Sequence, residues 1–195
     1  ANVVFSGDEA GDITFATDGG TATFSEIEGV WGTLGDDTLD ASAGATDVYF
    51  YGNGGTDSIA GGSGNDTLVA ASGNDTLLGG GGNDTINAGS GDDYIEGGAG
   101  DDTIDGGFGN DVIDGGTGDD QIQGLVGDDT IRIFDNFGND TIDGHFQSNV
   151  TGDVLDLSGV TTDLTLDLTA ADSEDGSFTD GTSTATFVEI ENIVL

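Results

Sequence analysis

The sequence of 195 residues lacks several things that ordinary folded proteins contain: it has no cysteine, one histidine (His145) and one basic side chain (Arg132). Without cysteine, no disulfide can hold the framework, and bound metal is the obvious substitute for such a staple. A single fixed cation gives nucleic acid or an anionic membrane almost nothing to bind, so we expect neither among the partners. We also expect no enzyme activity, and a lone histidine in a glycine-rich loop is typical of a surface residue.

Long hydrophobic runs are missing as well. No stretch reaches the ~18 consecutive apolar residues of a membrane span, so we expect no membrane-crossing helix. Residues 1–5 have no basic region before a hydrophobic core, so no signal peptide is visible, although one could have been removed.

Glycine and acidic residues are what the sequence has in excess. It contains 38 glycines, well above the usual share of about 7%. Its 39 Asp and Glu residues give a formal net charge of −38. Such a composition predicts disorder for the metal-free chain, and folding if cations meet the carboxylates in register. Halophilic adaptation is an alternative source of acidity, but it spreads acids over a surface, whereas these aspartates keep a fixed phase.

The aspartates belong to ten nine-residue blocks between residues 52 and 143, the tenth of which follows a two-residue insertion at 133–134. In all ten blocks the fourth position is Gly, the sixth is Asp and the eighth is Ile or Leu. This is the nonapeptide G-G-x-G-x-D-x-U-x, the signature of a parallel β-helix that binds calcium. The sixth-position residues are Asp57, Asp66, Asp75, Asp84, Asp93, Asp102, Asp111, Asp120, Asp129 and Asp140.

Each block is expected to form half a coil. Positions one to six predict a turn, where Gly permits left-handed backbone angles and Asn or Asp at position five tolerates them. Positions seven to nine predict a short strand whose central residue points inward. Two blocks then close one coil, so the expected fold is all-β, with residue i stacked on residue i+18. The two inner ladders are expected to contain Ile59, Leu77, Ile95, Ile113 and Ile131, and Leu68, Ile86, Ile104, Ile122 and, after the insertion, Ile142.

The same stacking places the sixth-position aspartates in two columns at the ~4.8 Å spacing of strands, where they repel unless cations lie between them. Calcium suits such sites, because it takes about six to eight oxygen ligands in irregular geometry, whereas magnesium needs a tight octahedron and softer metals need His or Cys. We expect several calcium ions, held by carboxylates of successive coils and by turn carbonyls. The expected carbonyl donors are Gly55, Gly64, Gly73, Gly82, Gly91, Gly100, Gly109, Gly118, Gly127 and Gly138, and Asp37 and Asp153 are additional candidates. In the alternative interpretation the aspartates only cap turns, although Asn or Ser would serve that purpose equally well at some positions.

These blocks resemble the RTX repeats of Gram-negative proteins that are exported by type I secretion, and the match covers residues 52–143. The resemblance implies a right-handed parallel β-roll, calcium in both rows of turns, and folding only after export, at the cell surface or outside the cell. Some turn glycines of the family pattern are replaced here, and weaker sites are expected there, above all in the last repeat. The replacements are Ala70, Ala71, Ala88, Leu125 and the pair Asp135-Asn136.

The segments beside the repeats predict two β flanks. We expect an N-terminal flank or cap at 1–31, the calcium-binding roll at 32–158 and a C-terminal flank at 159–195. Residues 15–28 and 178–191 are alike from end to end, and both alternate apolar and polar side chains as strands do. The chain is therefore either a piece of a longer tandem array or a protein whose ends stack head to tail, since an open solenoid end must be capped or polymerise.

Two functional hypotheses follow. In the first, the chain is an extracellular calcium-binding structural module that folds on Ca²⁺ after secretion. It would then be part or subunit of an adhesin, fibre, matrix or surface layer, with self-association through the solenoid ends. In the second, its surface binds a ligand: ice, through the ranks of Thr at position seven, or carbohydrate, as in the repeat modules of alginate epimerases, which the blocks resemble. Tyr94, Val112 and Gln121 interrupt the Thr ranks. The aromatic residues that could stack on a sugar are Trp31, Tyr49, Tyr51 and Tyr94.

Overall fold

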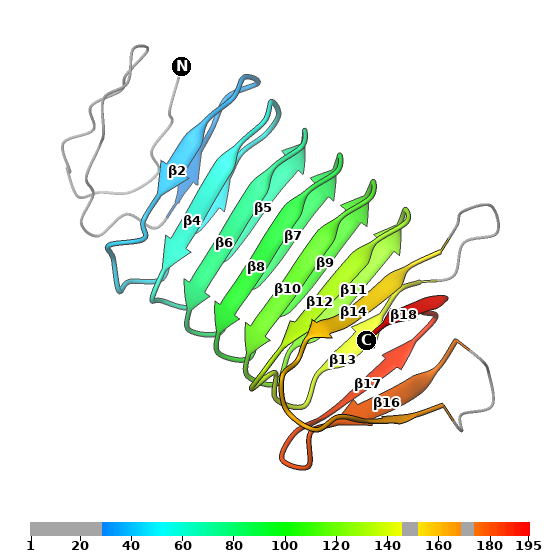
Figure 1. The fold of residues 1–195 in the computed structure, drawn as a ribbon. Helices are drawn as coiled ribbons and strands as arrows, with labels where there is room; N and C mark the ends of the chain where they lie inside the picture. Colours follow the sequence, from blue (N-terminus) through cyan, green and yellow to red (C-terminus); the bar gives the residue numbers. More distant parts are fainter. Residues whose placement is uncertain (1–28, 146–151, 169–173) are drawn as a thin grey trace.

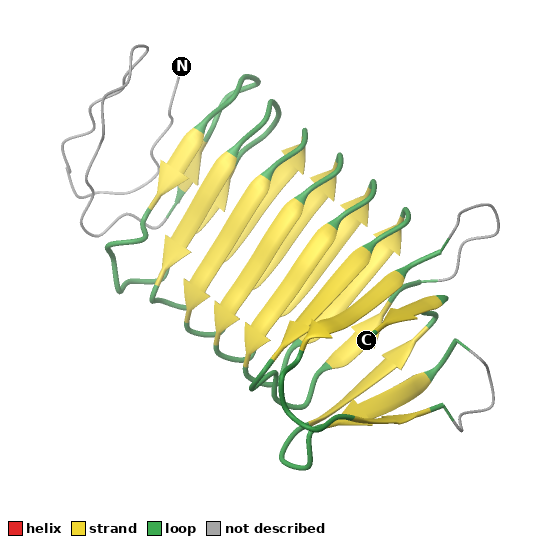
Figure 2. Ribbon diagram, viewed as in Figure 1, coloured by secondary structure: helices red, strands yellow, loops and turns green. Residues whose placement is uncertain are grey.

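The computed structural model describes residues 29–145, 152–168 and 174–195, and within these ranges every regular element is a β-strand (Figure 2). The strands form two sheets. The first has ten strands, in the order β1 (Val30–Trp31), β3 (Tyr49–Tyr51), β5 (Thr67–Ser72), β7 (Thr85–Ser90), β9 (Thr103–Phe108), β11 (Gln121–Val126), β13 (Thr141–Asp143), β17 (Thr184–Val188), β16 (Gly176–Thr179) and β15 (Thr165–Asp167). The second has eight, in the order β18 (Asn192–Val194), β14 (Val154–Gly159), β12 (Thr130–Phe134), β10 (Val112–Thr117), β8 (Tyr94–Ala99), β6 (Thr76–Gly81), β4 (Ser58–Gly62) and β2 (Thr38–Asp40).

Strands that follow one another in the chain alternate between the two sheets from β1 to β14, and each strand from β1 to β12 pairs in parallel with the strand two places later. Through the repeats the register is a shift of two blocks: Thr67 pairs with Thr85, and Thr85 pairs with Thr103. One coil is therefore two strands and two turns, and the stacked coils give the elongated body in Figure 1. The prediction of an all-β parallel roll, with residue i paired to residue i+18, is confirmed. Among the residues that the structure describes, there is no helix of the length and apolarity that a membrane crossing needs.

The two predicted ladders of aliphatic side chains are confirmed. Ile113 pairs with Ile95 in the second sheet, and Ile122 pairs with Ile104 in the first. Every predicted member of both ladders is at most 1% exposed. Ile142 pairs with Ile122 although the insertion at 133–134 lies between them, so the two extra residues are absorbed without moving an inward side chain out of the ladder.

The strands are longer than the pattern predicts. Each strand from β5 to β11 runs from position seven of one block through position three of the next, so the turn is confined to positions four to six. The backbone bends at position two, where φ is positive, and then resumes pairing, as Gly80 does with Gly98. A Cβ on Gly98 would lie 2.2 Å from the carbonyl oxygen of Gly80, so only glycine lets the coils approach closely enough to continue the ladder without strain.

Four more strands follow β14. β17 extends the first sheet in parallel on β13, β18 extends the second on β14, and β16 and β15 add antiparallel strands beyond β17. The Phe178 ring contacts Phe137 and Phe187, at centroid distances of 5.0 and 6.4 Å. The division of the chain at 31 and 158 stays a prediction. The segment 15–28, which resembles 178–191, lies outside the described residues.

Candidate metal sites

The ten sixth-position aspartates are all buried, with exposed fractions of 0% to 3%. Each follows a glycine turn and directly precedes a strand. Five precede strands of the first sheet and five precede strands of the second, so they form two columns, one in each row of turns. The structure thus stacks the predicted aspartates of successive coils in two columns.

One oxygen of each carboxylate is used to link neighbouring coils. The backbone N–H of Asp93 donates to Oδ1 of Asp111 at 2.8 Å, and the N–H of Asp111 donates to Oδ1 of Asp129 at 2.8 Å. Throughout both columns these bonds are 2.6–3.0 Å long. They fix the orientation of each carboxylate, and with it the direction of the second oxygen.

That second oxygen has no donor. Oδ2 is fully buried and accepts no hydrogen bond in nine of the ten aspartates, Asp57 through Asp129 in sequence order. An unsatisfied buried carboxylate oxygen destabilises the fold, because it has lost its hydrogen bonds to water and has formed none within the protein. Nine repetitions of this arrangement are typical of a row of cation sites rather than of nine separate defects.

The space in front of Oδ2 is created by the glycine at position one. A Cβ built on Gly61 would lie 2.3 Å from Oδ2 of Asp66 and 2.7 Å from the carbonyl oxygen of Gly79 in the next coil. A Cβ on Gly97 would lie 2.5 Å from Oδ2 of Asp102. A carboxylate of one coil and a carbonyl of the next therefore converge on the same small space, as a cation with several oxygen ligands requires.

The fourth-position glycines offer further oxygens. In the described turns, the backbone bonds between coils use the carbonyls of positions three and six, as in Gly91 N–H to Phe108 O and Thr103 N–H to Asp84 O. The carbonyls of position four accept no hydrogen bond from the described residues. These carbonyls, which the sequence predicts as ligands, are therefore available.

Burial raises the pKa of these carboxyls, and in most of them neighbouring carboxylates, inside or beside the column, raise it further. The pKa rises to about 6 for Asp57, Asp84 and Asp120, to about 7 for Asp93, Asp102, Asp111 and Asp129, and to about 8 for Asp140. Ionised columns are thus unfavourable near neutral pH unless a cation accompanies them.

The two additional candidates differ. Oδ2 of Asp37 accepts the backbone N–H and the hydroxyl of Thr33, at 2.5 and 2.9 Å, so it is already satisfied. Asp153 is 3% exposed, its Oδ1 accepts the N–H of Asp129 at 2.8 Å, and burial raises its pKa to about 7. Asp153 therefore continues the column in the manner of the repeat aspartates. Asp37 begins the same column, since its N–H donates to Oδ1 of Asp57 at 2.8 Å, but its Oδ2 already has donors.

Glu191 occupies the next position of that column, and sequence reasoning missed it. Its Oε2 accepts the N–H of Asp153 at 2.6 Å, as an aspartate of the following coil would. The signal was present in the order of acid, polar residue, aliphatic residue at Glu191, Asn192 and Ile193, which matches positions six to eight.

The replaced glycines leave the columns intact. Ala70 and Ala88 are fully buried at position one, yet Asp75 and Asp93 keep an unsatisfied Oδ2. Ala71 and Leu125 take positive φ values of 83° and 71° at position two, where six blocks have glycine and two have asparagine. In the last repeat, Asp135 accepts hydrogen bonds from Thr161 and Thr162, outside the column. Asp140 of the same repeat is still buried and accepts the N–H of Asp120 at 3.0 Å.

A second ladder lies at position five. Oδ1 of Asn65 accepts the N–H of Asn83 at 2.8 Å, and the same bond recurs from coil to coil at 2.8–3.1 Å. Its direction is opposite to that of the aspartate column, because here the earlier coil provides the side chain. The expectation that position five uses left-handed angles is wrong: no described residue at this position has a positive φ. Asn and Asp are found there because their side-chain oxygen bonds the next coil.

Comparison with known families agrees with this geometry. No curated protein matched the chain. The family model described as RTX calcium-binding nonapeptide repeat (4 copies) matches residues 31–68, 51–86, 78–113, 105–132 and 132–150. The matches together span 31–150, which is more than half of the sequence, and repeats of this family bind Ca²⁺ in structural modules of proteins that are typically secreted. The chain belongs to the RTX calcium-binding nonapeptide repeat family.

Proposed function

We propose that the columns of aspartates hold calcium ions between successive coils, and that the chain is an extracellular structural module that folds on calcium after secretion. The observation that carries the proposal is the set of nine buried Oδ2 atoms without a donor. The proposed ligands are the ten sixth-position aspartates, Asp153 in continuation, and the position-four carbonyls from Gly55 to Gly138. No catalytic role is part of this function.

Calcium supplies what the protein part lacks. The inner ladders are one aliphatic side chain deep, while the turns concentrate acids with one Arg in the whole sequence. Each ion would join two coils and remove the repulsion within a column. Since the sites are assembled only when coils stack, the free energy of binding adds to that of folding.

The proposal accounts for folding in the right compartment. Extracellular calcium modules typically have dissociation constants of about 10⁻⁴–10⁻³ M, so they are loaded outside the cell and empty inside it. A chain that stays unfolded at low calcium remains exportable. The family's typical occurrence in secreted proteins supports this inference.

As a rod of stacked coils, the module suits a spacer or building block of an adhesin, fibre, matrix or surface layer. The outermost strand β18 of the second sheet carries Val194 and is followed by Leu195, which are 45% and 77% exposed. An apolar strand at a sheet edge favours pairing with another chain, which supports end-to-end self-association.

The test is a calcium titration of chelator-treated protein, followed by far-UV circular dichroism and light scattering. A transition from coil to β structure near millimolar calcium, with magnesium inactive, is the expected result. Scattering that grows with the transition supports self-association, and a constant monomer rules it out. Full β structure in chelator would overturn calcium-coupled folding.

Surface binding of ice or carbohydrate has less support. In the first sheet Thr67, Thr85 and Thr103 stand in register at position seven, but Gln121 follows them. The other outward position of these strands holds unlike residues, such as Val69, Asn87 and Asp105, so the Thr rank is one residue wide. A thermal-hysteresis assay and a glycan screen on calcium-loaded protein test this alternative.

A further inference from the structure

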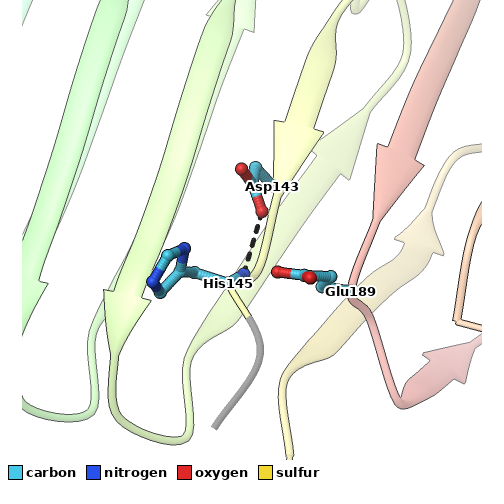
Figure 3. A group of neighbouring side chains, drawn as sticks. All are labelled: Asp143, His145 and Glu189. Atoms are coloured by element: carbon cyan, nitrogen blue, oxygen red, sulfur yellow. Dashed lines mark hydrogen bonds between the residues drawn. The ribbon is translucent and has the colours of Figure 1, made fainter.

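A group of potential metal ligands lies outside the calcium columns, at the end of β13. Asp143 ends this strand, His145 follows shortly after it, and Glu189 follows β17 (Figure 3). One ligand atom from each of the three residues lies within 4.8 Å of the other two. The group contains the sole histidine of the sequence.

The pairing of β13 with β17 creates this group from segments that are far apart in the sequence. Asp143 pairs with Val188, and the N–H of Gly144 donates to the Val188 carbonyl at 3.1 Å. A Cβ on Gly144 would lie 2.3 Å from the carbonyl oxygen of Glu189, so the two backbones are in close contact. The three side chains therefore lie where the paired strands β13 and β17 end, side by side.

The backbone around each ligand is also fixed. Oδ1 of Asp143 accepts the N–H of His145 at 3.0 Å, and Oδ1 of Asp175 accepts the N–H of Glu189 at 3.1 Å. These bonds determine how the two chain segments turn at His145 and Glu189, where φ is 69° and 56°.

The charge around the group also favours a cation. Two carboxylates lie close together, and the one basic side chain, Arg132, belongs to β12 in the other sheet. A metal ion would neutralise this cluster.

We propose that Asp143, His145 and Glu189 bind one divalent transition-metal ion of the zinc class, distinct from the calcium ions of the roll. The imidazole decides the class: the calcium columns offer oxygen only, whereas a nitrogen and two carboxylates suit zinc and its neighbours. Zinc ligands lie about 2.0–2.2 Å from the metal, so two of them can be at most about 4.4 Å apart. In Figure 3 the imidazole ring points away from both carboxylates, so binding requires the ring to rotate toward them, with water completing the shell. Such an ion would fasten β17 to the last repeat.

The chain has a built-in reporter, because its single histidine gives one set of imidazole NMR signals. Zn²⁺ is added to the full chain in saturating calcium, which keeps the roll folded and its oxygen sites filled. The expected result is a shift of the imidazole signals that is complete at one equivalent of Zn²⁺. With Co²⁺ as the probe, the visible spectrum of a nitrogen-ligated ion is expected to appear in parallel.

His145→Asn is the central variant, because asparagine tolerates the positive φ of this position. It should weaken Zn²⁺ binding by at least about 100-fold, since even outer-shell changes cost roughly 10–100-fold. Its calcium-induced dichroism should be unchanged, which shows that the variant folds. Asp163→Asn, an exposed acid elsewhere, is the charge control and should bind Zn²⁺ as the wild type does.

The double variant Asp143→Asn with Glu189→Gln separates a built site from a single surface histidine. It should lose the response at one equivalent while keeping its imidazole signals and its calcium-dependent fold. The proposal is overturned if wild-type imidazole signals do not respond to stoichiometric Zn²⁺, or if the double variant responds as the wild type does.

Discussion

The backbone N–H of Asp84 donates a 2.8 Å hydrogen bond to Oδ1 of Asp102 in the next coil, while Oδ2 of the same carboxylate stays buried without a donor. In this side chain Oδ1 links two coils by a hydrogen bond, whereas Oδ2 is left for a cation. Substitution by asparagine separates them, because asparagine keeps an Oδ1 acceptor but replaces Oδ2 with a donor that repels a cation.

Asp102→Asn should therefore raise the calcium concentration at the folding midpoint several-fold and reduce the number of bound ions. The matched control is the neighbouring Asp101→Asn, an exposed residue whose Oδ1 accepts the N–H of Asp119 at 2.9 Å. The control should change stability by less than about 0.5 kcal/mol. Calorimetric titration measures both, and equal effects of the two substitutions would contradict the assignment of Oδ2.

The stability of the metal-free chain should increase with acid. Burial raises the pKa of all ten column carboxyls above the ordinary value of 3.8, and to about 6 to 8 in eight of them. A raised pKa means that the folded state binds protons more tightly than the unfolded state. The resulting stabilisation is fully present below about pH 4 and is lost as pH rises through 6 to 8.

Circular dichroism in chelator between pH 4.5 and 8 measures this trend, with light scattering as a check because the isoelectric point is about 4.1. More β structure at pH 4.5 than at pH 8 is expected, and calcium should release protons near pH 7. A chelated chain that is most structured at pH 8 would show that the columns are not desolvated as described.

Two substitutions at position two, in paired residues of successive coils, should change the stability of the roll in opposite directions. Ala71 has a φ of 83°, and Ala71→Gly should stabilise the calcium-bound roll by roughly 0.5–1 kcal/mol because it relieves a left-handed alanine. Gly89→Ala should destabilise it by roughly 1–3 kcal/mol, since the new Cβ would lie 2.3 Å from the Ala71 carbonyl oxygen. Denaturant unfolding at fixed calcium measures both, and equal signs would refute the backbone argument.

The strands beyond the repeats should open separately from the coils. Phe178→Ala removes the ring that contacts Phe137 and Phe187, and a buried Phe→Ala change typically costs about 3–5 kcal/mol. Hydrogen exchange should accelerate in β15 to β17 and remain slow in β6 to β10. Uniform acceleration along the whole chain would instead show that roll and extension unfold as one unit.

The periodic features of the fold followed from the sequence because one rule, residue i above residue i+18, places every member of a ladder. Ile95 over Leu77 and Asp102 over Asp84 needed only the nonapeptide phase and the known alternation of strands. Even the displaced Ile142 could be placed by counting the insertion.

The features that could not be predicted depend on contacts between segments outside the nine-residue repeat. The antiparallel strands β15 and β16 lack the repeat, and the approach of Glu189 to His145 joins segments of unrelated sequence. The ladder at position five was missed for another reason. Asn and Asp suit both a left-handed turn and a side-chain hydrogen bond, and the sequence alone does not distinguish these uses.

The interruption at Ile133 and Phe134 gives the stack an internal landmark between near-identical blocks. Ile133 is 3% exposed, and beside it the register shifts so that Phe134 pairs with Gly159. A stack of uniform blocks could slide by one coil and exchange each partner for an equivalent one. Here such a slide would separate Phe134 from Gly159, the pairing beside which the extra residues are accommodated. The insertion thus helps to fix the register of the coils, and bound calcium would stabilise this register without determining it.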